Sequence, residues 1–173
     1  MSKPIRYDSL LIRDLAAELH ATLANAPLHA VRFDRDTLVL ELLTGDARWS
    51  WALHPMRGEL LRLDVASVDG NVLLQRHARI AAISSMPDER IVAIAIAGDD
   101  GDAHGGQANR IVVELLTNQW NALALAGDQR IVHVLRPRTT STRTLRAGEV
   151  YAAPAPAGRA GVDAPLTLDA WMT

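Results

Sequence analysis

Cysteine is absent from this chain of 173 residues. Without thiols there is no disulfide framework, no thiol nucleophile and no zinc site built on thiolates. Long apolar runs are also missing. No stretch approaches the roughly 20 residues that cross a bilayer, and charged residues interrupt the segment that follows Met1, unlike a signal sequence. We therefore expect a cytoplasmic protein that does not contact a membrane.

Ligand patterns for metals and nucleotides are missing as well. None of the six histidines is spaced from another as a pair of metal ligands would be, and the acidic, Gly-rich stretch 98–107 lacks the later glutamate of a calcium loop. No Gly-rich phosphate loop follows an apolar strand. We expect no metal, no cofactor and no catalytic residues, and thus a binding module rather than an enzyme.

Lysine is scarce, because Lys3 is the only one and arginine supplies the rest of the positive charge. The net charge is −2, but arginines gather between positions 130 and 146, where only Asp128 and Glu149 oppose them. Threonines and a serine lie between these arginines, and such cations and hydroxyls suit contacts to phosphate. The alternatives are a solvated polar loop and an arginine usage set by genome composition. The candidate contacts here are Arg136, Arg138, Arg143 and Arg146.

The periodicity predicts one helix followed by a series of strands. Apolar residues between Asp8 and Asn25 recur at steps of three and four, Asp8 or Ser9 can cap the N-terminus, and Pro27 prevents extension. Alternation then predicts strands joined by short turns. They cover 28–33, 37–42, 48–53, 59–64, 80–84, 90–96, 110–116, 121–126 and 130–135, and a second helix is expected at 69–79.

The last part of the chain has a different composition. Pro154, Pro156 and Pro165 stand among alanines and glycines, which is typical of an extended arm. From Leu166 to Trp171 the pattern favours the start of a further helix, as in a fragment of a longer chain or in a short relative. We expect one domain over residues 1–150 and an arm with a helix start over 151–173.

Six short strings stand in order along most of the chain, namely Asp8-Ser9-Leu10-Leu11-Ile12-Arg13, Ala52-Leu53-His54-Pro55, Leu73-Leu74-Gln75-Arg76-His77, Arg90-Ile91-Val92, Val113-Glu114-Leu115-Leu116 and Ala147-Gly148-Glu149-Val150-Tyr151-Ala152-Ala153-Pro154. In this order they resemble the N-terminal domain of the NFACT proteins. These are ribosome-quality-control factors of the RqcH and NEMF type, formerly called the fibronectin-binding protein A family.

The resemblance implies an α+β, mainly β fold. Two sheets would form a β-sandwich or pseudobarrel capped by helices, as in the N-terminal domain of formamidopyrimidine-DNA glycosylases. It also implies an RNA-binding module for tRNA and the rRNA of the large ribosomal subunit, within a factor that acts on stalled translation. The resemblance leaves open whether the protein forms a homo-oligomer.

The family pattern points to candidate RNA contacts outside the arginine segment. Glu89 and Arg90 stand where the family has an Asp-Arg pair, and Arg76 with His77 lies on the second expected helix, where they would face a nucleotide. The alternatives are a solvated charge pair and a packed histidine. Trp120 replaces a family histidine and is expected to pack in the core or to offer a stacking surface.

Two other functions compete with RNA binding. One is a protein-interaction domain, either for dimerisation or of the kind that the fibronectin-binding label implies. The other is a DNA glycosylase, which the sequence disfavours because those enzymes use an N-terminal proline followed by glutamate, whereas Ser2 and Lys3 stand here.

Overall fold

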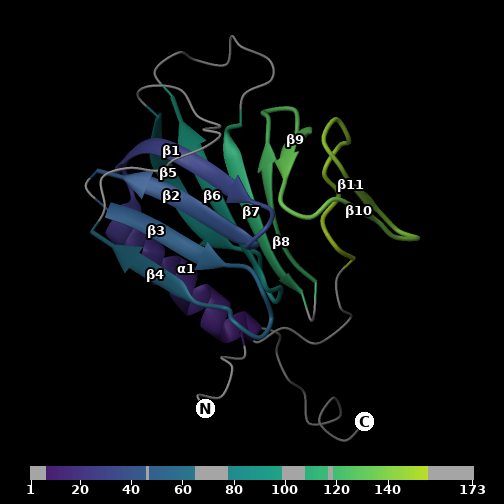
Figure 1. Cartoon of the computed structure of the whole chain (residues 1–173), viewed down its shortest axis with the longest axis horizontal. Coiled ribbons are helices and arrows are strands. Elements are labelled where there is room, and N and C mark those ends of the chain that lie inside the picture. The colour runs from purple at the N-terminus through teal and green to yellow at the C-terminus, as the bar shows by residue number, and fades with distance from the viewer. Residues whose placement is uncertain (1–6, 46, 65–77, 99–107, 117–118, 156–173) are drawn as a thin grey trace, which may run out of the picture.

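The computed structural model describes residues 7–45, 47–64, 78–98, 108–116 and 119–155. They form a mainly β structure with antiparallel strands and one helix (Figure 1). The elements are α1 (Ser9–Leu23), β1 (Pro27–Asp34), β2 (Val39–Thr44), β3 (Ala47–Ala52), β4 (Leu60–Leu63), β5 (Ala78–Ser85), β6 (Ile91–Ala97), β7 (Arg110–Leu116), β8 (Gln119–Leu125), β9 (Ile131–Val134), β10 (Arg138–Thr139) and β11 (Thr144–Leu145).

The N-terminal helix begins and ends as its sequence predicts. The Asp8 side chain accepts a hydrogen bond of 2.8 Å from the Leu11 N–H and so satisfies a donor of the first turn. After the last turn Asn25 adopts a left-handed conformation with φ 64°, which stops the helix ahead of β1. Its buried face consists of Ile12, Ala16, Leu19 and Leu23.

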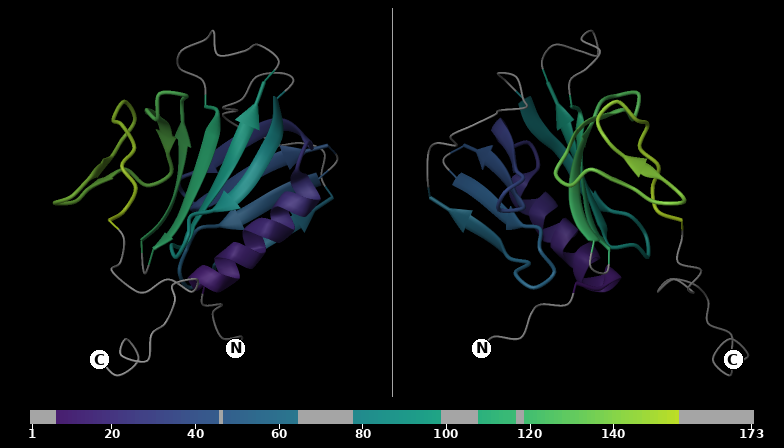
Figure 2. Two further views of the ribbon diagram at one scale, coloured as in Figure 1. Left: turned by 180° about the vertical axis from the view of Figure 1, so that it is seen from behind. Right: turned by 45° about the vertical axis from the view of Figure 1, so that its right-hand side comes forward.

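Nine strands pair in the order β4-β3-β2-β1-β5-β6-β7-β8-β9, all antiparallel to their neighbours. The β1–β5 pairing is short, since only Leu28 with Ala78 and Pro27 with Arg79 are in register. The sheet therefore bends there into an N-terminal half-sheet (β1–β4) and a C-terminal half-sheet (β5–β9), which lie at an angle to each other (Figure 2).

The main core lies between the two half-sheets. It joins inward side chains of both half-sheets, such as Leu40 and Trp51 with Ile94 and Val113, to the buried face of α1. β1 begins beside β5, but the other end of its hairpin reaches β9. There the Phe33 and His133 rings are 4.9 Å apart, and Arg35 donates to the Val134 carbonyl at 3.1 Å. The half-sheets thus meet at both margins, as in a pseudobarrel.

The outer face of the C-terminal half-sheet carries a second apolar cluster. Val112, Leu123 and Ile131 are buried there under Leu145 of the β10–β11 ribbon, with Tyr151 packed against them. This covering explains why β7 and β8 are apolar on both faces, with burial on successive residues. Figure 1 shows the ribbon beside β9.

The α+β, mainly β fold is confirmed, and so are the predicted N-terminal helix and all nine predicted strands, to within a few residues. The half-sheets belong to one continuous sheet rather than to two separate ones. The second predicted helix falls mostly outside the described residues. Its predicted end is wrong, because Ala78 and Arg79 pair with β1 as the start of β5.

The predicted helix start at 166–171 also lies outside the described residues. The α1 helix, which is the helix of the described ranges, has neither the length nor the apolar composition of a membrane-spanning segment.

Candidate functional site

The register of the C-terminal half-sheet brings separate polar residues to one end of the molecule. Ile91 is opposite Glu114, and Glu114 is opposite Asn121. The pairing of Leu123 with Val134 places Arg136 next to Asn121 on the far side. Adjacent strands lie about 4.8 Å apart, so this transverse row spans roughly 14 Å. Arg90 immediately precedes the row, and its carbonyl accepts from Leu115 N at 2.8 Å.

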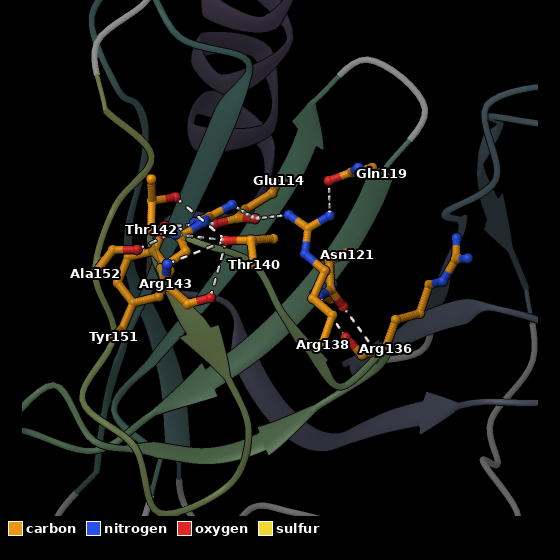
Figure 3. A network of polar contacts seen from close by, with 11 residues as sticks. Glu114, Gln119, Asn121, Arg136, Arg138, Thr140, Thr142, Arg143, Tyr151 and Ala152 are labelled. Carbon is orange, nitrogen blue, oxygen red and sulfur yellow. Dashed lines mark hydrogen bonds and ion pairs between the residues drawn. The ribbon is translucent and has the colours of Figure 1, made fainter.

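Glu114 is a fully buried carboxylate on the outer face of this row. Arg143 binds it with two parallel hydrogen bonds of 2.6 and 2.8 Å, the Tyr151 hydroxyl donates to Oε1 at 2.9 Å, and Arg138 lies 3.7 Å from Oε2 (Figure 3). A carboxylate buried in an apolar strand requires such partners. The network therefore ties the segment 138–152 to β7.

The pKa shifts in this network follow from burial and from the Glu114 charge. Burial alone would lower the pKa of Arg143, but its hydrogen bonds with Glu114 and the attraction of that carboxylate outweigh burial, and the pKa is raised. Burial and the neighbouring Glu114 raise the pKa of Tyr151 well above its usual range. The Arg138 pKa is lowered instead, first by burial and then by Arg143 and Arg136, against the opposing effect of Glu114.

Buried Asn121 fixes the position of Arg136. Its side-chain Nδ2 donates to the Arg136 carbonyl at 2.9 Å, and its Oδ1 accepts from the Arg136 N–H at 2.9 Å. The same oxygen also accepts from Ala122 N at 3.0 Å. Because one buried amide holds both backbone groups of Arg136, the chain leaves β9 in a defined direction. The Arg136 side chain extends away from the Glu114 network (Figure 3).

The Arg138 and Arg136 guanidinium groups differ in their contacts. Arg138 donates to the Gln119 side chain and faces Glu114, while its buried Nε has no hydrogen-bond partner among the described residues. Arg136 makes no side-chain hydrogen bond or ion pair within the described ranges. Three arginines, Arg136, Arg138 and Arg143, stand against the single charge of Glu114, which leaves an excess of two positive charges on this cluster.

A cleft of about 440 Å³ lies beside this cluster, between the β1–β2 turn, the β3–β4 loop and the β9–β10 connection. Its lining consists of Leu38, His54, Pro55, Met56 and Arg136. Met56 N donates to His54 Nδ1 at 3.2 Å, so the neutral imidazole carries its hydrogen on Nε2. An apolar surface and a cation thus share one concave site.

Tyr7 and Trp120 pack against the β3–β4 loop, which lines the cleft. The Tyr7 hydroxyl donates to the Gly58 carbonyl at 3.0 Å, and the Tyr7 ring meets the Trp120 ring edge-on with centroids 5.2 Å apart. A Cβ at Gly58 would lie 2.2 Å from the Trp120 ring, so only glycine fits against it. Trp120 is 4% exposed. It is therefore a packing residue, as predicted, and the alternative of a stacking surface is wrong.

The structure separates the predicted contact residues. Arg76 and His77 lie outside the described residues. Glu89 and Arg90, in the β5–β6 connection, are half-buried at the same end of the sheet as Arg136 and Arg138. This proximity in space could not be seen from their positions in the sequence.

The remaining two arginines of the segment have other surroundings. Arg143 has a side chain only 7% exposed and is committed to Glu114. Arg146 is exposed, two residues before Gly148, whose N–H donates to Ile131 at the opposite end of β9 from Arg136.

Sequence reasoning overlooked four residues that build the site, namely Glu114, Gln119, Asn121 and Tyr151. For Glu114 a signal existed, because it is the one charge inside the apolar run 111–116 and a buried charge needs a partner. Asn121 likewise begins an apolar run, 121–126. Nothing in the sequence indicated that these side chains would hold Arg143 and Arg136.

Several solved structures share this fold, including the following three. The N-terminal domain of fibronectin-binding protein PavA from Streptococcus pneumoniae matches with TM-score 0.64 and 21% identity over 87% of this chain and 62% of its own. The N-terminal part of the fibronectin/fibrinogen-binding protein FBPS from Streptococcus suis matches with TM-score 0.70 and 18% identity over 87% and 62%. The fibrinogen binding protein from Staphylococcus aureus matches with TM-score 0.66 and 17% identity over 86% and 56%.

At these identities, the structural similarity shows a shared fold. The chain spans about three fifths of the length of the solved structures that it matches. No protein-family model matches the sequence, and no curated protein matches it.

Proposed function

We propose that this domain is a non-catalytic RNA-binding module for tRNA or the RNA of the large ribosomal subunit, as part of a cytoplasmic quality-control factor of the NFACT type. The sequence strings that resemble that family lie within a fold shared with the N-terminal domains of PavA and FBPS. The resemblance supplies the kind of RNA. The geometry supplies a surface that suits it.

The observation that carries the proposal is that hydrogen bonds and an ion pair hold Arg136 and Arg138 at one end of the sheet. Arg136 is held through its backbone by Asn121, and Arg138 is held by Gln119 and Glu114. Guanidinium groups match phosphate oxygens in a fork, and Arg138, whose side chain is already held, loses little side-chain entropy on binding. Arg90 lies on the same end and extends the surface along the row. Arg143 does not belong to this surface, but it binds Glu114, which in turn contacts Arg138.

Filter binding of tRNA and of a large-subunit rRNA fragment at low and at higher salt tests the proposal. Each phosphate contact releases counterions, so affinity should fall steeply as salt rises. Arg90→Ala and Arg138→Ala should each weaken binding. Arg130→Ala is the matched control, because Arg130 is 55% exposed and precedes the opposite end of β9. Absence of binding, or binding that ignores salt, would overturn the proposal.

A protein-interaction domain is the second candidate, favoured by the names of the three solved structures, which refer to fibronectin or fibrinogen. Surface plasmon resonance with immobilised fibronectin, and size-exclusion chromatography with and without RNA, separate the two functions. Saturable fibronectin binding without RNA binding would replace the first proposal by the second.

A further inference from the structure

The cleft beside Arg136 combines a cation with an exposed apolar surface. Met56 is 68% exposed, the highest value among the exposed large apolar side chains of the described residues, and Pro55 and Leu38 continue its surface into the cleft. A phosphate-binding surface alone needs no apolar lining. This combination therefore indicates a ligand with both an anionic group and a flat apolar part.

The backbone of the lining is held by hydrogen bonds at Leu38 and at Arg136. Leu53 N donates to the Leu38 carbonyl at 2.8 Å, which joins the β1–β2 turn to the start of the His54 loop. Leu38 itself has φ 58°, a left-handed conformation that the turn imposes on it. Asn121 fixes Arg136 from the other side. Because this backbone is fixed in advance, it loses little conformational entropy when a ligand binds.

The two ends of the cleft offer different chemistry. The Arg136 guanidinium makes no side-chain hydrogen bond or ion pair within the described part of the chain, so its fork of donors can bind a phosphate. The Met56 thioether and the Pro55 ring present soft, flat surfaces that can contact the face of a base. His54 can donate through Nε2 to a ribose or base oxygen. The volume of about 440 Å³ falls in the range of small-ligand sites.

Single-stranded RNA presents this combination of groups, whereas a duplex does not. In a duplex the base faces are stacked on one another, and only the phosphates and groove edges are accessible. In a single strand each nucleotide exposes a base beside its phosphate. Free phosphate would leave the apolar half of the cleft unused.

We propose that this cleft binds one unpaired nucleotide of an RNA, with the phosphate on Arg136 and the base against Met56 and Pro55. The proposal rests on the proposed RNA-binding function and adds to it a preference for single-stranded segments, such as the unpaired end of a tRNA.

Fluorescence anisotropy with a labelled single-stranded RNA of ten nucleotides, and with a duplex of the same length, tests the site. Arg136→Ala should weaken binding of the single strand about tenfold, and Met56→Ser should weaken it about fivefold. Met56→Ser should leave duplex binding unchanged. Arg130→Ala is again the control, and thermal melting checks that each variant is folded. Adenosine monophosphate should shift the His54 ring signals in an NMR titration.

Each outcome decides the matter. Loss of single-strand binding in both variants, with the His54 shift, supports the site. Salt-dependent binding of tRNA that neither variant weakens overturns the site and leaves the RNA-binding function standing. Equal loss of single-strand and duplex binding in Arg136→Ala, with no effect of Met56→Ser, reduces Arg136 to a general phosphate contact and overturns the site. If no RNA binds at low salt, the function fails and the site with it.

Discussion

Glu114 should be the polar residue on which the stability of the domain depends most strongly. Its carboxylate is fully buried, and Arg143, whose side chain is 7% exposed, binds it with two short hydrogen bonds. Glu114→Gln keeps the shape but leaves the Arg143 charge without a counterion. Loss of one partner of a buried pair costs about 3–5 kcal/mol.

This cost can be measured as a change in thermal and chemical stability. For a chain of this size one kcal/mol shifts the melting temperature by about 2–4 °C, so Glu114→Gln should melt about 10 °C lower than the parent. Urea unfolding followed by circular dichroism should give the matching fall in the free energy of unfolding. Arg130→Ala removes the exposed pair with Asp128 and the hydrogen bond from Arg130 to the Gly148 carbonyl, and should cost only about 1–2 kcal/mol.

A double variant separates the ion pair from simple packing. Glu114→Leu combined with Arg143→Met should be more stable than Glu114→Gln, because the buried Arg143 charge is removed together with its counterion. Arg138, whose side chain is 20% exposed, and the Tyr151 hydroxyl lose the Glu114 carboxylate in both variants. If Glu114→Gln loses less than about 1 kcal/mol, the carboxylate is not the anchor described here. A double variant as unstable as the sum of its single changes would likewise refute the reasoning.

Three further predictions concern packing and pH. Gly58→Ala would bring a Cβ to 2.2 Å from the Trp120 ring and should lower the free energy of unfolding, measured in urea titrations, by about 1–3 kcal/mol. The same change in a Trp120→Phe background should cost less, because the smaller ring leaves room for the added Cβ. Burial raises the Tyr151 pKa, so the unfolded chain loses the hydroxyl proton first as pH rises. The free energy of unfolding should therefore fall as pH rises above 10.0. Tyr151→Phe should make this fall smaller in urea midpoints measured at high pH. Burial, aided by Arg35, lowers the His133 pKa, so the free energy of unfolding should fall as pH drops below 6.5. His133→Phe keeps a ring beside Phe33 and should make the melting temperature fall less steeply with decreasing pH. An unchanged dependence of the melting temperature on pH would contradict this role of His133.

The candidate site shows where prediction from sequence stops. The arginine segment was predicted as one set of phosphate contacts, yet its four members have different environments, with Arg146 exposed at the opposite end of β9. Arg143 is buried against Glu114, Arg138 is shared between Glu114 and Gln119, and Arg136 is exposed. The spacing of these arginines along the chain does not predict their environments, because each environment depends on how the β10–β11 ribbon turns over the outer face of the sheet.

Local patterns in the sequence by themselves determined α1 and the strands. Periods of 3.6 and 2, a capping aspartate and turn residues act within a few positions, so they are readable without the fold. Only the tertiary structure decided which residues meet. The register across four strands places Ile91, Glu114, Asn121 and Arg136 in one row, although as many as 45 positions separate them. The bend between β1 and β5 then brings Leu38 and His54 to Arg136, because burial of the core between the half-sheets outweighs any local preference.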